Sequence, residues 1–196
     1  MNLDRKKRQG TRKIMKGQRE MKVIGGKNES DKTLPHPDYK PIIDKTIDFI
    51  KQHFKKDVLA CALFGSVARG TATPHSDIDL FIVHRKSPKD MVREFSHVVK
   101  RLRQTEEYRS RIAQGFIPEP YPVFVDKEKL KKHPWILLDI LDHGIILFDR
   151  SDILKRELKR LRKRLRELGA YKVVLPDKSW YWVLKPDWKP GEIIQL

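Results

Sequence analysis

Hydrophobic residues in the stretch 41–57 recur at the spacing of an α-helix. They are separated by steps of four, three and four residues: Ile43, Ile47, Ile50 and Phe54. This periodicity places them on one face of a helix. Pro41 lies near the start of the stretch, and Lys55 and Lys56 lie near its end, where positive charge complements the helix dipole. The pattern predicts an amphipathic helix at the start of the folded part of the chain.

Four short apolar runs follow and read as β-strands. The run VLACALF (58–64) is apolar throughout and too short for most helices, which indicates a buried strand. The others are DLFIVH (79–84), YPVFVD (121–126) and IILFD (145–149). Prolines at the start of the third run indicate an edge strand or a bulge.

Two helical patterns separate these strands. One lies between Ser87 and Gly115, with a break expected at Thr105 or Ser110 because the apolar pattern weakens after Leu102. The other covers the stretch PWILLDILDHG and can end with Gly144 as its C-terminal cap.

The C-terminal part begins with a strongly basic helix, which Ser151 or Asp152 can cap. Its leucines form a seam: Leu154, Leu158, Leu161, Leu165 and Leu168. Eight Lys and Arg residues lie between Lys155 and Arg166. Such a helix packs its seam on the body of the protein or on a second copy, giving a homodimer, and its basic ridge could also face RNA. Beyond it, alternating Trp180, Trp182 and Leu184 predict a strand.

Composition indicates one domain of ordinary size with an appendage. The chain has 196 residues, of which 39% are hydrophobic and 35% are charged. Abundant Lys, Glu and Arg with one cysteine are typical of a cytosolic protein of a thermophile. No apolar stretch is long enough to span a bilayer, and no apolar core follows the basic N-terminus. We therefore expect a cytoplasmic protein without a membrane partner.

The formal net charge of +17 is unevenly distributed. Residues 1–28 contain ten Lys and Arg residues against Asp4 and Glu20, without a sustained apolar period. Such a segment is expected to be a flexible, solvated arm, and it can also contact nucleic acid or an acidic partner. The expected organisation is a basic arm over 1–36, a main domain over 37–150 and the basic helix with a Trp-rich segment over 151–196.

Residues 65–79, GSVARGTATPHSDID, lie between the first two predicted strands and contain the candidate chemistry. Gly65 allows a sharp turn and the close approach of a ligand. Ser66 can cap a short helix and donate its hydroxyl to phosphate, while free N–H groups at that helix start attract anions. Arg69 and the turn at Gly70 could add further contacts to a nucleotide.

Asp77 and Asp79 are two positions apart, so their side chains point to the same side of a strand. Two neighbouring carboxylates repel each other unless a cation lies between them, and Mg²⁺ binds a few carboxylates together with substrate phosphates. Either aspartate could instead be solvated at the surface, and neither Gly-Ser nor Asp-x-Asp is informative alone. Their order and spacing between two strands favour a metal-dependent phosphoryl or nucleotidyl transfer site.

This stretch resembles the signature of the DNA polymerase β nucleotidyltransferase superfamily in its minimal, archaeal form. The shared pattern is Gly-Ser, ten residues and Asp-x-Asp, here from Gly65 to Asp79. The resemblance implies an α/β (α+β) fold with a small mixed sheet and flanking helices over 37–150. It also implies a nucleoside triphosphate, most readily ATP, bound by Gly65 and Ser66, and Mg²⁺ bound by Asp77 and Asp79.

The superfamily usually has a third carboxylate on a neighbouring strand. Alignment of the stretch PEPYPVFVD puts Tyr121 or a proline at that position. Glu119, which has the same strand parity as Tyr121, is the nearest substitute and our candidate catalytic residue. Asp126 is the other candidate, and the third carboxylate could also be absent.

The favoured function is Mg²⁺-dependent transfer of a nucleoside monophosphate, most readily AMP, to a hydroxyl of a protein, RNA or small molecule. The signature also resembles minimal nucleotidyltransferase antitoxins, which implies a helical HEPN-type ribonuclease toxin as a possible partner. The alternatives are a module that binds nucleotide or RNA without transferring a nucleotide, and a structural partner that dimerises through the leucine seam.

Overall fold

The computed structural model describes residues 13–16, 19–23 and 36–196, the first two ranges by their backbone. The chain divides into two compact units. The larger unit lies within residues 32–158, and the smaller one combines residues 159–196 with the described residues among 1–31. No helix in the described part of the chain is both long and apolar enough to cross a membrane.

A four-stranded mixed sheet forms the centre of the larger unit, in the order β5-β4-β3-β6. The strands are β3 (Val58–Leu63), β4 (Ile78–His84), β5 (Pro120–Asp126) and β6 (Ile145–Asp149). Strand β3 pairs antiparallel with both β4 and β6, while β4 and β5 are parallel. The predicted α/β class and mixed sheet are confirmed, and β5 lies at an edge as its prolines indicated.

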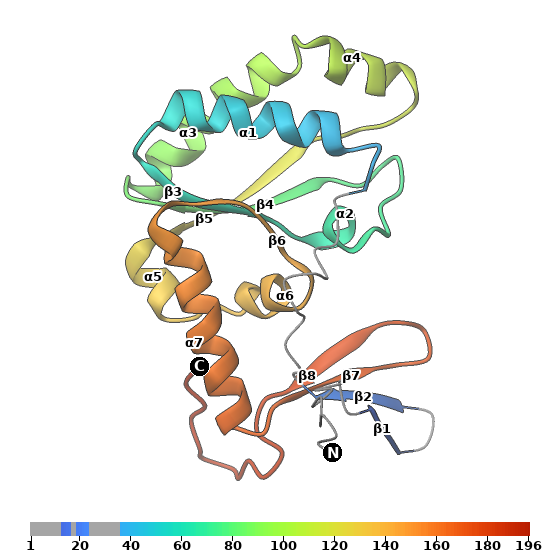
Figure 1. Cartoon of the computed structure of the whole chain (residues 1–196), viewed down its shortest axis with the longest axis vertical. Coiled ribbons are helices and arrows are strands. Elements are labelled where there is room, and N and C mark those ends of the chain that lie inside the picture. Colours follow the sequence, from blue (N-terminus) through green and yellow to red (C-terminus); the bar gives the residue numbers. More distant parts are fainter. Residues whose placement is uncertain (1–12, 17–18, 24–35) are drawn as a thin grey trace, which may run out of the picture. The chain divides into compact units, whose positions relative to one another are not determined.

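Helices cover both faces of this sheet (Figure 1). On one face lie α1 (Lys40–Phe54), α3 (Pro88–Leu102) and α4 (Glu106–Ala113), and on the other α5 (Lys127–Lys131) and α6 (Ile136–His143). The predicted break between α3 and α4 is confirmed at Thr105, whose side chain accepts a hydrogen bond from the Tyr108 amide. The short α2 (Gly65–Arg69) connects β3 to β4.

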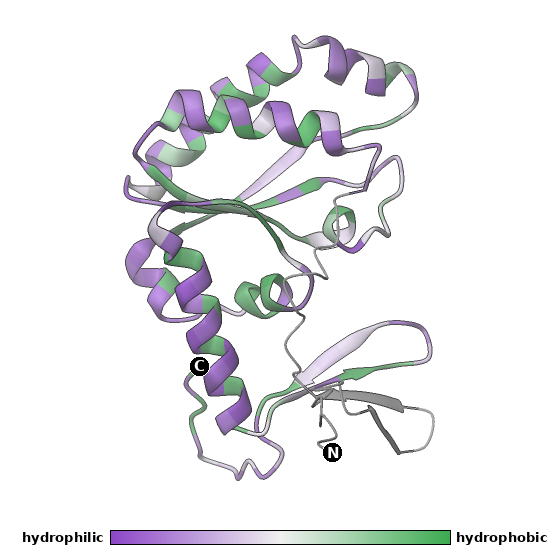
Figure 2. Cartoon of the chain, in the orientation of Figure 1, coloured by the Kyte–Doolittle hydropathy of each residue, from purple (hydrophilic) through white to green (hydrophobic). Residues whose placement is uncertain are grey.

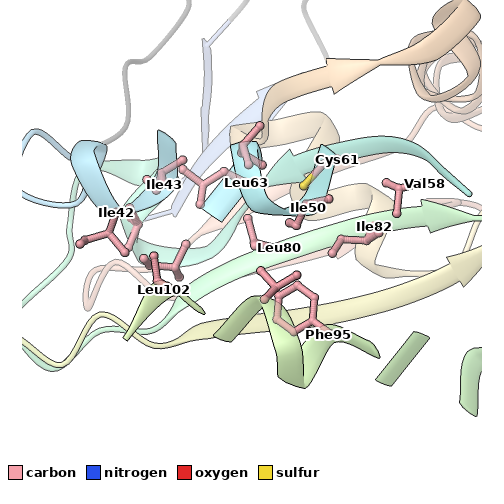
Figure 3. Close-up of a cluster of buried hydrophobic side chains, with 14 of the residues drawn as sticks. Ile42, Ile43, Ile50, Val58, Cys61, Leu63, Leu80, Ile82, Phe95 and Leu102 are labelled. Carbon is pink, nitrogen blue, oxygen red and sulfur yellow. The ribbon is translucent and has the colours of Figure 1, made fainter. Parts of the chain in front are cut away.

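The main core lies between the sheet and the helices α1 and α3. The apolar face predicted for α1 is buried there together with alternate residues of β4, namely Ile78, Leu80 and Ile82 (Figure 3). In Figure 2 the hydrophobic colouring follows the central strands and one side of these helices. Burying each such side chain contributes about 1.5–3 kcal/mol. Cys61 is fully buried, and burial raises the pKa of its thiol.

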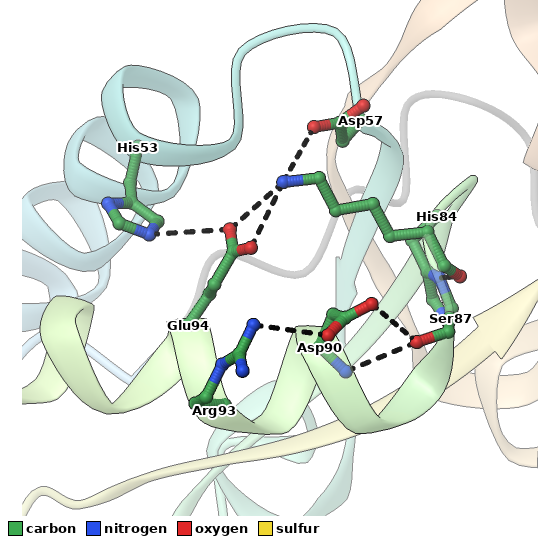
Figure 4. A network of polar contacts seen from close by, with 8 residues as sticks. His53, Asp57, His84, Ser87, Asp90, Arg93 and Glu94 are labelled. Carbon is green, nitrogen blue, oxygen red and sulfur yellow. Dashed lines mark hydrogen bonds and ion pairs between the residues drawn. The ribbon is translucent and has the colours of Figure 1, made fainter.

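A polar network ties the end of α1 to the end of β4 and to α3 (Figure 4). The Lys86 ammonium lies 3.0 Å from Asp57 and 3.0 Å from Glu94, and His53 of α1 lies 3.6 Å from the same glutamate. Hydrogen bonds to Asp57 and then to Glu94 raise the pKa of Lys86. The network therefore engages the carboxylates of Asp57 and Glu94.

The smaller unit contains an antiparallel sheet in the order β1-β2-β7-β8. Its strands are β1 (Lys13–Lys16), β2 (Arg19–Val23), β7 (Tyr171–Val174) and β8 (Trp180–Val183). The predicted strand with alternating tryptophans is confirmed as β8. Strands β1 and β2 lie within the segment expected to be a flexible arm, whose polar sequence had not indicated them. Residues 1–12, 17–18 and 24–35 of that arm lie outside the described residues.

The basic helix is α7 (Ile153–Glu167), preceded by the 3₁₀ turn η2 (Arg150–Asp152). Leu154, Leu158, Leu161 and Leu165 are buried within the single chain, so the seam packs on the chain itself.

Of the two expected helix caps, that of α7 is wrong and that of α6 is confirmed. Ser151 and Asp152 have left-handed φ angles of 54° and 51°, and the Asp149 carboxylate instead accepts hydrogen bonds from the amides of Leu154 and Lys155 at 3.1 and 2.9 Å. Gly144 is the C-terminal cap of α6, as predicted, with a φ of −64°. Its lack of a side chain is required for space, because an added Cβ would lie 2.6 Å from the Ile140 carbonyl oxygen.

We predict that Asp149→Ala destabilises the protein by about 1–2 kcal/mol, because two amides at the start of α7 lose their acceptor. Asp152→Asn is the matched control, because asparagine tolerates the left-handed φ of 51° and the change removes an exposed carboxylate that pairs with Lys155. Denaturant unfolding of both variants checks this. Equal loss of stability in the two variants would contradict the capping role of Asp149.

Candidate active site

The turn that follows β3 brings Gly65 directly against Asp79. Gly65 has a φ of +71°, which favours glycine, and an added Cβ would lie only 1.9 Å from the Asp79 Oδ2 atom. The Phe64 amide donates to the Asp79 carbonyl oxygen at 3.0 Å and holds the two strand ends together. A residue with a side chain at position 65 would therefore displace the carboxylate.

Ser66 lies in the first turn of α2 and is half-buried. Phe64 occupies the N-cap position and no side chain caps the helix, so the expectation that Ser66 is the cap is wrong. The Ser66 carbonyl accepts from Thr71, and no partner of its hydroxyl is found among the described residues. The hydroxyl is therefore available to a ligand. Arg69, at the end of the same helix, is close enough for its charge to act on Asp79.

Two residues from outside the motif anchor the loop between Gly70 and Asp77. The buried Tyr39 donates its hydroxyl to the Thr73 carbonyl at 2.5 Å, and the Ile117 amide donates to the Pro74 carbonyl at 2.8 Å. Burial is the main cause of the raised pKa of Tyr39. Sequence reasoning missed Tyr39, because it precedes the first predicted helix, in the proline-rich stretch TLPHPDYKP.

Asp77 and Asp79 lie on either side of Ile78, which is fully buried. Asp77 is exposed at the end of the loop, and Asp79 is half-buried at the start of β4. Burial and then the negative charge of Asp77 raise the pKa of Asp79, while Arg69 opposes the shift. Because the negative charge of Asp77 acts on the Asp79 carboxylate, a cation bound between the two would be stabilised by both.

The position expected for a third carboxylate and the two candidate residues, Asp126 and Glu119, have separate environments. In the parallel register of β4 and β5, Asp79 pairs with Tyr121, an exposed residue, and so Tyr121 occupies the neighbouring position. Asp126 pairs with His84, five positions further on and about 16 Å away, and accepts from the amides of Glu128 and Lys129. Hydrogen bonds from these amides lower the pKa of Asp126.

Glu119 lies immediately before β5, and its carboxylate is held by helix residues. It accepts a hydrogen bond from Tyr108 of α4 and forms an ion pair with Arg103 at 3.0 Å. Burial, followed by the hydrogen bond to Glu119, raises the pKa of Tyr108 to about 12. Tyr108 belongs to the core cluster with Ile78, whereas Asp79 alternates to the other side of β4. The Ile78 amide, between the two aspartates, donates to the Glu119 carbonyl at 2.8 Å. Glu119 thus borders the aspartate pair through its backbone, while its carboxylate is engaged by Tyr108 and Arg103.

The aspartate pair fits Mg²⁺ bound together with a nucleotide. Among the described residues, no group of three or more His, Cys, Asp or Glu side chains could hold a metal ion. Mg²⁺ commonly takes one or two carboxylates and completes its shell with substrate phosphates and water. Asp77 and Asp79 beside the Gly65 turn provide that number of ligands.

Comparison with known proteins identifies the family of the chain. The profile of the nucleotidyltransferase domain family matches residues 43–175. A putative protein adenylyltransferase of Methanocaldococcus jannaschii is 29% identical over 143 residues, which is 72% of this chain and 90% of that protein. The family match places the chain in the class of nucleotide-transferring enzymes. It belongs to the nucleotidyltransferase domain family, as the signature between Gly65 and Asp79 predicted.

The solved structures to which the chain is similar include two types of protein. A toxin–antitoxin with AMP-PNP has 17% identity and a TM-score of 0.39, over 63% of this chain and 90% of that one. A spectinomycin adenyltransferase of Enterococcus faecialis, with ATP and spectinomycin, has 12% identity and a TM-score of 0.43, over 66% of each chain.

We predict that Gly65→Ala abolishes most nucleotidyl transfer, because the new Cβ must displace the Asp79 carboxylate. Gly70→Ala is the matched control: its φ is +74°, so it pays a similar backbone cost of about 1–2 kcal/mol, but nothing lies within 4 Å of the added Cβ. Transfer rates and unfolding curves of both variants check this. A similar loss of activity in the two would assign the effect to backbone strain.

Proposed function

We propose that the protein transfers AMP from ATP to a hydroxyl group of a protein. The observation that carries the proposal is the contact of Asp79 with Gly65, which puts a metal-binding carboxylate beside the turn available to phosphates. In the reaction the acceptor oxygen bonds to the α-phosphorus, and the bond from that phosphorus to the β-phosphate oxygen breaks. Pyrophosphate leaves with that electron pair, and the hydroxyl proton passes to a base or to water.

In this proposal Gly65 lets the triphosphate approach the backbone, and Ser66 donates its hydroxyl to a phosphate oxygen. Arg69 offers a positive charge on the same side, and Asp77 and Asp79 hold Mg²⁺. Bound Mg²⁺ would neutralise charge on the triphosphate and support an in-line displacement. Tyr39 and Ile117 act as positioning residues, since they hold the loop that ends at Asp77.

The reaction needs a base for the acceptor hydroxyl, and neither Tyr121 nor Glu119 offers a free carboxylate for that role. Tyr121 stands beside Asp79 where the resemblance implies a carboxylate, and the Glu119 carboxylate is engaged by Tyr108 and Arg103. We propose that Glu119 has a structural role and that the proton leaves through the acceptor's own groups or water. The expected rate is therefore modest, because a positioned base contributes about 10²–10⁴-fold.

ATP and a protein acceptor are favoured by the name of the Methanocaldococcus jannaschii relative. An RNA or small-molecule acceptor, and a HEPN-type protein partner as in antitoxins of the minimal type, stay predictions from the sequence. A second candidate function is a nucleotide-binding module without transfer. The specific observation in its favour is Tyr121 at the position of the third carboxylate.

The experiment incubates the full chain with each of the labelled ribonucleoside triphosphates and Mg²⁺, with and without cell extract or total RNA. We expect label from ATP on protein and release of pyrophosphate. The isosteric Asp77→Asn/Asp79→Asn variant should lose this label, because its side chains keep their size and lose their charge. Nucleotide binding by the wild type without any transfer would reject the enzyme and leave the binding module.

A further prediction concerns Tyr121. Tyr121→Glu places a carboxylate beside Asp79 and should raise the transfer rate by about tenfold or more at saturating ATP. Tyr121→Gln is the control, because it has nearly the same size and no charge. Without Mg²⁺ the Glu variant should melt at a lower temperature than the Gln variant, since three carboxylates then repel each other. Equal rates in the two variants would show that the missing acid does not limit transfer.

A further inference from the structure

A cavity lies at the end of the central sheet opposite the aspartate pair. This cavity of about 650 Å³ opens where β3 begins and where β4, β5 and β6 end. The candidate active site is at the other end of the sheet, where β3 ends and β4 begins. Arg85, which lines the cavity, directly follows β4 and comes six residues after Asp79. At the rise of a strand, this separates the two residues by about 20 Å.

Five cations line this cavity and come from four separate parts of the chain: Lys56, Arg85, Lys127, Arg150 and Arg156. No carboxylate forms an ion pair with any of the five within the described part of the chain. Among the described residues, the acceptors found for their side chains are two carbonyl oxygens, that of Lys55 for Arg150 and that of Ser151 for Arg156.

The carboxylates next to these cations in sequence are already engaged. Asp57 pairs with Lys86, as Figure 4 shows, and Asp126 accepts from the first amides of α5. Asp149 accepts from the first amides of α7, and Asp152 pairs with Lys155. Like charges that converge without counter-charges repel each other, and an anionic ligand removes that cost.

The character of the lining favours an extended anion over a compact one. All five cations are exposed, while Leu59 and Ile153 are buried and supply the apolar part of the wall. A small-molecule site usually has a few polar groups in fixed positions within an enclosed apolar pocket. Here the charged groups are exposed to solvent instead. The lining has no aromatic side chain on which a base could stack. It therefore suits contacts to phosphates rather than to bases.

We propose that this cavity binds the phosphodiester backbone of a single-stranded nucleic acid, without reading its sequence. The site is separate from nucleotidyl transfer and does not depend on the proposed reaction. Five cations around one cavity match a strand that presents a negative charge at every nucleotide, and the net charge of +17 attracts such a strand over a distance.

The test measures binding of fluorescent oligo(U) and oligo(dT), about 12 nucleotides long, to the full chain by anisotropy at several salt concentrations. The cavity variant is Lys56→Gln/Arg85→Gln/Lys127→Gln, which leaves the two arginines with carbonyl contacts in place. We expect an affinity loss of about tenfold or more. The slope of log K against log salt should fall by about 2, because each lost contact to a single strand removes about 0.7.

The matched control is Lys89→Gln/Lys100→Gln/Arg109→Gln. It also removes three positive charges, here from exposed residues of α3 and α4. No ion pair of these three residues is found among the described residues. This variant should keep its affinity within about threefold and most of its salt slope. Unfolding curves and label transfer from ATP verify that both variants are folded.

The oligonucleotides distinguish the sources of the ligand. Binding of both, lost in the cavity variant, supports backbone recognition, and binding of oligo(U) alone assigns the strand to RNA. Equal losses in the cavity and control variants would overturn the proposal in favour of overall charge. It would also be overturned if the cavity variant lost affinity for inorganic tripolyphosphate or for a poly-glutamate peptide while its oligonucleotide affinity stayed unchanged.

Discussion

The antiparallel pairing of β3 with β4 is the constraint on which the candidate active site depends. It brings the end of one strand level with the start of the other, so that Phe64 donates to the Asp79 carbonyl and Gly65 meets the Asp79 carboxylate. Other parts of the larger unit support that pairing. Helices α1 and α3 bury the inner face of the two strands, and Tyr39 holds the loop between them.

The sequence indicated much of this arrangement because its signals are local. Apolar runs of strand length, helical periodicity in α1 and the spacing from Gly65 to Asp79 each depend on neighbouring residues, and these elements formed as expected. Thr105 could be recognised as a helix boundary for the same reason, because a threonine cap acts within one turn.

Features that depend on distant residues could not be predicted in the same way. Strands β1 and β2 have a polar, basic sequence that does not indicate strands. Strand β2 pairs with β7, about 150 residues later in the chain, and β1 pairs with β2. Ser151 and Asp152 are residue types that often cap helices, but both have a left-handed backbone conformation here. The Asp149 carboxylate accepts the hydrogen bond from the Leu154 amide instead. Glu119 has the parity of Tyr121, and only the position of Tyr108 and Arg103 shows where its carboxylate is held.

The close spacing of β3, α2 and β4 along the chain also bears on how the protein folds. Gly65 and Asp79 are separated by few residues, so closing the loop between them costs little chain entropy compared with the pairing of β3 with β6. Short loops close early, and contacts of low sequence separation favour fast folding. We therefore expect the strand pair that carries the aspartates to form before β5 and β6 join the sheet. During synthesis, the centre of the site would then be assembled while the C-terminal helix is still being made.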